Sequence, residues 1–305
     1  MLAAVAQRLI QLEKIAILTD LGDETERTLR YAASLARWYG SELMIVHACT
    51  PEMPVYMPPE PLLNWPADGP PQLKRYAEER LAALAEKVGM HDLTPKLVVR
   101  EAGIKLLLEE VAEHHPNLLI LATHGREGIR KWLLGSVTEG VFRAVQWPVL
   151  VLGPRFDSDR AARQIQLRTV VYATDLSKVS ISALQYAAGI ARDHDAQLIA
   201  LHVEHDPRKD FLFDRAMSLQ KLQDWMKDRI DGLADALSGV KCTVEFGKPY
   251  AAITQAAETH HADLLVLGAR GLGAVSISAS HFLGGTAYDV VCSATCPVLI
   301  VPQPR

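Results

Sequence analysis

The sequence contains the same motif twice, and this internal repeat constrains the fold more than any other feature. The tripeptide Thr19–Leu21 (TDL) recurs 155 residues later as Thr174–Leu176, and each copy follows a short apolar run. The register is kept further along, because Leu43–His47 (LMIVH) and Leu198–His202 (LIALH) are also 155 residues apart. The chain is therefore a duplication of a unit of about 150 residues, a common size for one domain.

The composition is that of an ordinary globular protein, with 305 residues, 49% apolar residues and a formal net charge of −4. This length predicts two domains that each bury a core. No basic block is present, so nucleic acid is not expected as a partner. The apolar runs are shorter than the ~20 residues that span a bilayer. Residues 1–12, which include Arg8, contain no convincing signal-peptide cleavage site. We therefore expect a cytoplasmic protein that has no membrane partner.

The cysteines do not suggest disulfides or a metal site. Cys49, Cys242, Cys292 and Cys296 are not placed symmetrically in the two copies, and reduced thiols are expected in a cytoplasm. Cys292 and Cys296 are four residues apart on a predicted helix. No second ligand pair lies nearby in the sequence, so we expect half-buried thiols and no metal.

Each copy alternates short apolar runs with amphipathic stretches. The runs are continuous in Val, Ile and Leu, which indicates strands buried on both faces, and the helices between them predict a doubly wound α/β domain with a five-stranded parallel sheet. Strands are expected at 14–19, 42–48, 96–101, 118–122 and 148–152, and at 169–174, 197–203, 241–245, 263–268 and 297–301. Helices are expected at 24–39, 72–89, 104–115 and 136–146, and at 179–194, 211–238, 249–261 and 285–294. The predicted domains are 1–153, with an N-terminal extension at 1–13, and 169–305, joined by a polar linker at 154–168.

In such sheets ligands bind beyond the carboxyl ends of the strands, where the strand order switches. The residues expected at that edge are Asp20, His47 and Ala122 in the first copy and Asp175, His202 and Gly268 in the second. For the two histidines we expect hydrogen bonds rather than a metal ion.

The segment 50–71 contains eight of the seventeen prolines and is predicted not to form regular structure. It is predicted to be a long loop, either a surface flap without a role or a lid over the first site.

A glycine-rich loop in the first copy has the features of a phosphate site. Gly125 and Gly135 flank nine residues, and Ser136 with Glu139 forms a capping box at the start of a predicted helix. Unpaired N–H groups at such a helix start bind anions, and glycine lets the backbone approach the ligand. The alternative is a capped helix after a flexible loop. The sequence contains neither a Walker A motif nor a G-x-G-x-x-G after the first strand.

Together these motifs resemble the universal stress protein family over nearly the whole of both copies. They are a strand ending in Thr-Asp, a second ending near Leu-His-Val, and a fourth leading into G-2x-G-9x-G-(S/T), with Pro-Val-Leu-Val at the end. The resemblance implies a tandem, UspA-like protein whose two domains have the adenine nucleotide alpha-hydrolase-like fold. It also implies ATP, ADP or AMP as ligand, commonly with a divalent ion such as Mg²⁺.

Carried over to the first copy, the family pattern assigns the adenine side to Thr19, Asp20 and Ala48. It assigns the ribose and phosphates to Ala122, Gly125, Gly135, Ser136, Val137 and Thr138. Ala122 replaces the first glycine of the motif, which is expected to weaken binding without abolishing it.

The second copy departs further from the pattern. Its matching positions are Thr174, Asp175 and Val203 on the adenine side, and Gly268, Gly271, Gly284, Gly285 and Thr286 on the phosphate side. Twelve residues rather than nine separate Gly271 from Gly284, and Gly285 takes the place of the serine. We expect reduced or altered nucleotide binding there.

The resemblance implies a nucleotide-binding regulatory protein of the stress response. We do not expect a dedicated enzyme, because no residue set in the sequence forms a nucleophile–base arrangement. Two alternatives are a slow metal-dependent ATPase and an interaction scaffold that has lost nucleotide binding in its second domain. In the family the last strand pairs across a dimer. We therefore expect an internal pseudo-dimer of the two domains through 148–152 and 297–301, with a homodimer of chains as a further expectation.

Overall fold

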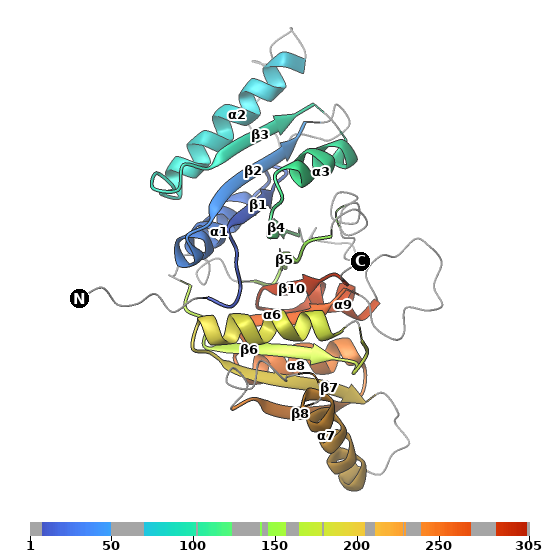
Figure 1. Cartoon of the computed structure of the whole chain (residues 1–305). Helices are drawn as coiled ribbons and strands as arrows, with labels where there is room; N and C mark the ends of the chain where they lie inside the picture. Colours follow the sequence, from blue (N-terminus) through green and yellow to red (C-terminus); the bar gives the residue numbers. More distant parts are fainter. Residues whose placement is uncertain are drawn as a thin grey trace, which may run out of the picture. The chain divides into compact units, whose positions relative to one another are not determined.

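The computed structural model describes residues 8–49, 70–101, 103–123, 141, 146–156, 165–178, 180–204, 211–227, 229, 239–269 and 285–303. The chain forms two compact units (Figure 1). The first-copy unit comprises Leu12–Leu152 and Asp157–Ile165. The second-copy unit comprises Gln166–Arg305 together with two segments from outside the second repeat, Met1–Gln11 and Gly153–Phe156.

The first-copy unit contains a parallel sheet with the strand order β3-β2-β1-β4-β5. The strands are β1 (Lys14–Leu18), β2 (Glu42–Ala48), β3 (Lys96–Arg100), β4 (Leu118–Ala122) and β5 (Val149–Leu152). The described helices are α1 (Thr25–Tyr39), α2 (Pro70–Lys87) and α3 (Ile104–Glu113). In Figure 1, α1 and α2 lie on one side of these strands and α3 on the other.

The second-copy unit repeats this topology, with parallel strands in the order β8-β7-β6-β9-β10. The strands are β6 (Thr169–Thr174), β7 (Gln197–Glu204), β8 (Lys241–Phe246), β9 (Leu264–Gly268) and β10 (Val298–Val301). The helices are α6 (Ser180–Asp193), α7 (Phe211–Lys227), α8 (Pro249–Thr259) and α9 (Gly285–Ser293). The doubly wound architecture predicted from the apolar runs is thus confirmed in both copies.

The strands are buried because helices cover both faces of each sheet. All four residues of β5 are buried, as are the last four of β1, so neither strand shows an alternating polar face. Helix α1 stops at Gly40, whose φ of 74° is left-handed and whose N–H donates to the carbonyl oxygen of Ala36. Helix α2 begins at Pro70, two residues before the predicted start, because proline is tolerated in a first helical turn.

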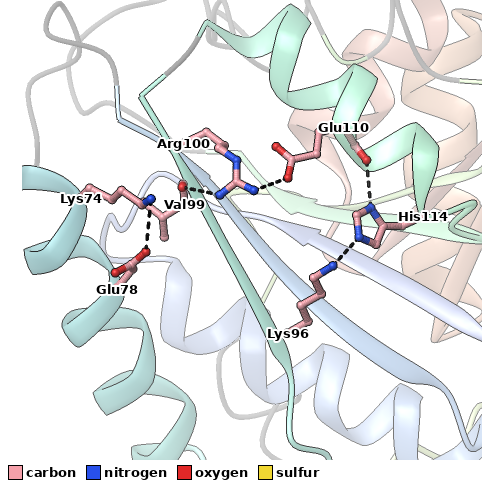
Figure 2. A network of polar contacts seen from close by, with 7 residues as sticks. All are labelled: Lys74, Glu78, Lys96, Val99, Arg100, Glu110 and His114. Atoms are coloured by element: carbon pink, nitrogen blue, oxygen red, sulfur yellow. Dashed lines mark hydrogen bonds and ion pairs between the residues drawn. The ribbon is translucent and has the colours of Figure 1, made fainter. Parts of the chain in front are cut away.

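The outer strand β3 carries charged side chains that bond to α3 (Figure 2). Lys96 bonds to Nε2 of His114, and Nδ1 of His114 bonds to the carbonyl oxygen of Glu110. Arg100 pairs with the carboxylate of Glu110. His114 therefore caps the C-terminus of α3 through a backbone carbonyl, which satisfies the imidazole without a metal ion.

The segment that follows β5 packs on the second-copy unit. A Cβ atom added to Gly153 would lie 2.5 Å from the carbonyl oxygen of Val291 in α9, so only glycine fits there. Arg155 donates to the carbonyl oxygen of Ser293 at 2.8 Å and lies 3.5 Å from a carboxylate oxygen of Glu258. The start of the predicted linker is thus anchored at the C-terminal end of α9. No helix in the described part of the chain is both long and apolar enough to cross a membrane.

Candidate functional site

The predicted adenine-side residues of the first copy, and Ala122 of its predicted phosphate side, lie at one edge of its sheet. Thr19 and Asp20 directly follow β1, Ala48 ends β2, and Ala122 ends β4. Strand β1 lies between β2 and β4 in parallel register, with Leu18 beside Val46 and Leu121. The chain leaves β1 toward β2 and returns on the other side through β4, so this edge is the topological switch point at which doubly wound sheets bind ligands.

A tight turn fixes the chain after β1. The hydroxyl of Thr19 accepts a hydrogen bond from the N–H of Leu21 at 3.1 Å and shares another with the Thr25 hydroxyl at 2.7 Å. The carboxylate of Asp20 accepts the N–H of Gly22 at 2.9 Å. Leu21 is left-handed, with a φ of 62°, which costs roughly 1 kcal/mol for a leucine. Because its side chain is buried, with 1% exposed, Leu21 anchors the turn and leaves Asp20 at the surface.

His47 holds this turn against β2. Its Nδ1 donates to the carbonyl oxygen of Thr19 at 2.9 Å, since a carbonyl can only accept. Burial lowers the pKa of His47, which favours the neutral imidazole. The prediction that this histidine is satisfied by hydrogen bonding is confirmed. The same holds for His202, whose Nδ1 lies 2.9 Å from the carbonyl oxygen of Thr174.

Strand β4 brings Thr123 to the same edge, and sequence reasoning did not select this residue. Its N–H donates to the carbonyl oxygen of Leu152 at 3.1 Å, and 6% of the residue is exposed. Its hydroxyl oxygen is buried and has no hydrogen-bond partner among the described residues. A buried hydroxyl without a partner is costly, and this one lies directly before the predicted glycine loop.

Apart from Ala122, the phosphate-side positions of the first copy fall beyond what the structure describes. Gly125, Gly135, Ser136, Val137 and Thr138 all lie outside the described residues. For the second copy, Gly271 and Gly284 also lie outside them.

The second copy repeats the turn after its first strand. The hydroxyl of Thr174 accepts the N–H of Leu176 at 3.0 Å, and Leu176 is left-handed, with a φ of 63°. Val203 lies near the end of β7 and Gly268 ends β9, so these positions again meet at the carboxyl edge. Gly285 and Thr286 are the exposed first residues of α9.

The aspartates of the two turns have different partners. The Oδ1 atom of Asp175 accepts both the N–H of Ser177 at 3.0 Å and the hydroxyl of Ser180 at 2.7 Å. Asp175 is half-buried, whereas Asp20 is exposed. The residue 155 positions before Ser177 is Gly22, whose N–H makes the same bond to Asp20. The hydroxyl bond differs, because Ser180 donates to Asp175 whereas its counterpart Thr25 bonds to the Thr19 hydroxyl. The carboxylate of Asp175 is therefore bonded both to its own turn and to the first residue of α6.

Two further positions at this edge differ between the copies. Glu204, next to Val203, accepts the hydroxyl of Ser218 at 2.7 Å and lies 3.5 Å from Nε2 of His202. The residue 155 positions earlier is Cys49, a buried thiol whose pKa is raised by burial. Aligning the copies could have revealed this exchange of a thiol for a carboxylate, although not the partners of Glu204.

The counterpart of Thr123 also differs. Ala269 follows β9 as Thr123 follows β4, and its N–H donates to the carbonyl oxygen of Val301 at 2.9 Å. The backbone bond is thus kept and the hydroxyl is lost. The described residues contain no cluster of three or more His, Cys, Asp or Glu side chains arranged to hold a metal ion.

Comparison with known proteins agrees with both the duplication and the fold. The model of the universal stress protein family matches residues 11–153 and again 166–302. A universal stress protein of Mycolicibacterium smegmatis is 24% identical over 301 residues, covering 95% of this chain and 97% of that protein. One from Thermus aquaticus is 38% identical over 141 residues, covering 44% of this chain and 98% of that protein.

Among solved structures, a universal stress protein from Archaeoglobus fulgidus superposes with a TM-score of 0.67 at 22% identity, covering 96% of this chain and 97% of that one. At this identity the likeness concerns the fold. Since the family model matches each copy almost from end to end, the chain belongs to the universal stress protein family and carries two of its domains in tandem.

Proposed function

We propose that the first copy binds an adenine nucleotide at the carboxyl edge of β1, β2 and β4, and that the protein acts as a nucleotide-responsive regulator and not as a dedicated enzyme. The proposal is supported by the switch point between β1 and β4, by the preorganised turn that presents Asp20, and by the match to the universal stress protein family.

The observation that carries the proposal is the buried hydroxyl of Thr123. Its oxygen has no partner among the described residues, although the residue is 94% buried and lies at the entrance of the glycine loop. A hydroxyl or phosphate oxygen of a ligand would satisfy it. A site that pairs such a group only when occupied gains affinity from the pairing, because the hydroxyl has already been removed from water.

The charge distribution orients the ligand. The carboxylate of Asp20 accepts hydrogen bonds and repels phosphate, so it suits the hydroxyl and amino groups of a nucleoside. The phosphates would then lie toward the loop 125–138, where glycine N–H groups and a helix N-terminus are expected. The family pattern assigns the base to the neighbourhood of Ala48, at the end of β2.

For the second copy we propose weaker or different ligand binding. Asp175 accepts two hydrogen bonds from its own domain. Ala269 lacks the hydroxyl of Thr123, and the carboxylate of Glu204 replaces the thiol of Cys49. The bonds of Asp175 compete with a ligand for its carboxylate, the change at Ala269 removes a hydroxyl that would bind a nucleotide, and Glu204 adds negative charge beside the adenine-side position Val203.

Titration calorimetry of the full chain with ATP, ADP and AMP, with and without Mg²⁺ and with GTP as a control, tests this proposal. We expect binding of an adenine nucleotide at one site per chain, its loss in Gly135→Val, and weakening in Asp20→Asn. The matched variant Asp175→Asn should leave the affinity unchanged. The absence of any heat with a folded protein at millimolar adenine nucleotide, or two equivalent sites, would refute it.

A further inference from the structure

The N-terminal segment 8–10, which we call the strap, lies on helix α6 of the second-copy unit, more than 180 residues away in sequence. The N–H groups of Leu9 and Ile10 donate to the two carboxylate oxygens of Asp193, at 2.8 and 3.0 Å. The Ile10 side chain lies against Gly189, where an added Cβ would be 2.5 Å from its Cδ1 and 2.6 Å from its Cγ1. Two successive N–H groups on one carboxylate are an anion-binding arrangement, here used to hold a peptide segment.

Both contact residues of α6 are poor choices for a helix on local grounds. Glycine inside a helix is less stable than alanine, and Gly189 is in the interior of α6. An acidic residue in the last turn is repelled by the helix dipole, and Asp193 is the last residue. The two are four residues apart, so they lie on the same face of the helix.

The strap accounts for both unfavourable residues at once. Gly189 leaves room for Ile10, and Asp193 accepts two N–H groups that would otherwise need water. In the first copy the positions 155 residues earlier are Ser34 and Trp38, which provide neither the gap nor the carboxylate. Two neighbouring residues that are both unfavourable for a helix, such as Gly189 and Asp193, indicate that the site serves a tertiary contact.

We propose that the Gly189–Asp193 face of α6 is a dedicated docking site for an extended peptide segment, and that its occupant is the strap of this same chain. The docked strap is a latch, because a few contacts fix the segment immediately before Leu12. Leu12 is itself buried, and its carbonyl oxygen accepts the hydroxyl of Ser41. The segment that precedes β1 is thus held at residues 9–10 and again at Leu12. Strand β1 in turn leads into the turn that contains Asp20.

Hydrogen exchange of the Leu9 and Ile10 amides in the full chain, followed by NMR, tests the latch. In the unmodified protein both amides should exchange at least tenfold more slowly than in an unstructured peptide. Gly189→Ala should abolish this protection, because its Cβ takes the space of Cγ1 and Cδ1 of Ile10. The double variant Gly189→Ala with Ile10→Ala removes both clashing atoms and should restore protection.

The carboxylate is tested by a matched pair. Asp193→Asn leaves a single acceptor oxygen for two N–H groups, and exchange of the strap amides should rise at least tenfold. Asp195→Asn makes the same change of charge at an exposed position two residues away and should leave the exchange unchanged. Alanine favours the helix, so circular dichroism should show Gly189→Ala folded. Unprotected amides in the unmodified chain, or unchanged exchange in Gly189→Ala or Asp193→Asn, would overturn the proposal.

Discussion

Removing the buried hydroxyl of Thr123 is predicted to raise the stability of the unliganded protein and to weaken nucleotide binding. Thr123→Val keeps the shape of the side chain and removes a hydroxyl that has no partner among the described residues. An unsatisfied buried polar group costs about 1–3 kcal/mol. Without ligand, the variant should therefore be more stable than the unmodified protein by about 1 kcal/mol, or about 2–4 °C in Tm for a domain of this size.

Nucleotide binding should respond in the other direction. If a ligand oxygen pairs with this hydroxyl, the variant loses a hydrogen bond worth about 0.5–1.5 kcal/mol, which raises Kd about twofold to twelvefold. Urea unfolding of the unliganded protein and titration calorimetry with ATP measure the two effects on the same preparation.

The control is the same substitution at a buried threonine whose hydroxyl is hydrogen-bonded. Thr254, in α8, is also buried, and its hydroxyl donates to the carbonyl oxygens of Tyr250 and Ala251 at 3.0 and 3.1 Å. Thr254→Val should gain no stability and leave ATP affinity unchanged. If Thr123→Val instead loses stability, its hydroxyl is bonded in the unliganded protein. If its ATP affinity is unchanged, the hydroxyl does not face the ligand. Either result refutes the reasoning.

The remaining predictions concern single, well-defined contacts. Asp175→Ala should reduce the free energy of unfolding by about 1–2 kcal/mol, because it removes the Oδ1 atom that accepts two hydrogen bonds; an unchanged free energy in urea unfolding would contradict this. Burial and the charge of Arg8 lower the pKa of His194 from 6.5 to about 4. Between pH 6.5 and about 4 this histidine is therefore protonated in the unfolded chain but neutral in the folded protein. Stability should therefore fall by up to roughly 3 kcal/mol as the pH drops from 6.5 to 4, and His194→Gln should flatten this part of the profile measured by thermal unfolding. Gly153→Ala should destabilise by about 1–3 kcal/mol, because its Cβ would meet a backbone oxygen at 2.5 Å, whereas Gly103→Ala, with nothing within 4 Å, should change stability by less than about 0.5 kcal/mol; similar values for the two would show that the segment after β5 moves freely.

The secondary structure of both copies was predictable because it follows from local patterns. Each predicted strand matches an observed strand to within one residue at either end, since a run of apolar residues between turns marks a strand buried on both faces. The repeat itself predicted two units of the same topology. Helix ends were less well predicted where capping decided them, as at the start of α2, where two prolines fit the first turn.

The carboxyl edge of each sheet was also predictable from the sequence. In a parallel sheet all strand ends meet at one edge, so Asp20 and Ala48 could be placed together without coordinates. The bonds at that edge could not be predicted, because they depend on side chains that are distant in sequence or on the exact turn geometry. Ser180 and Thr25 occupy equivalent positions in the two copies, and both carry a hydroxyl. Only the fold decided that Ser180 bonds to Asp175 whereas Thr25 bonds to Thr19.

The sequence by itself thus determined the duplication, the α/β topology and the edge at which a ligand would bind, because periodicity and strand direction are local or topological properties. The tertiary structure alone decided which polar groups are satisfied, such as Asp175 by Ser180. It also left some buried polar atoms without a partner in the described part of the chain, such as the Thr123 hydroxyl. It also decided that the strap packs against Gly189 and Asp193, a contact between residues more than 180 positions apart. Such contacts form or fail on differences of a few tenths of an ångström in the distances between packed atoms, and no pattern along the chain encodes these differences.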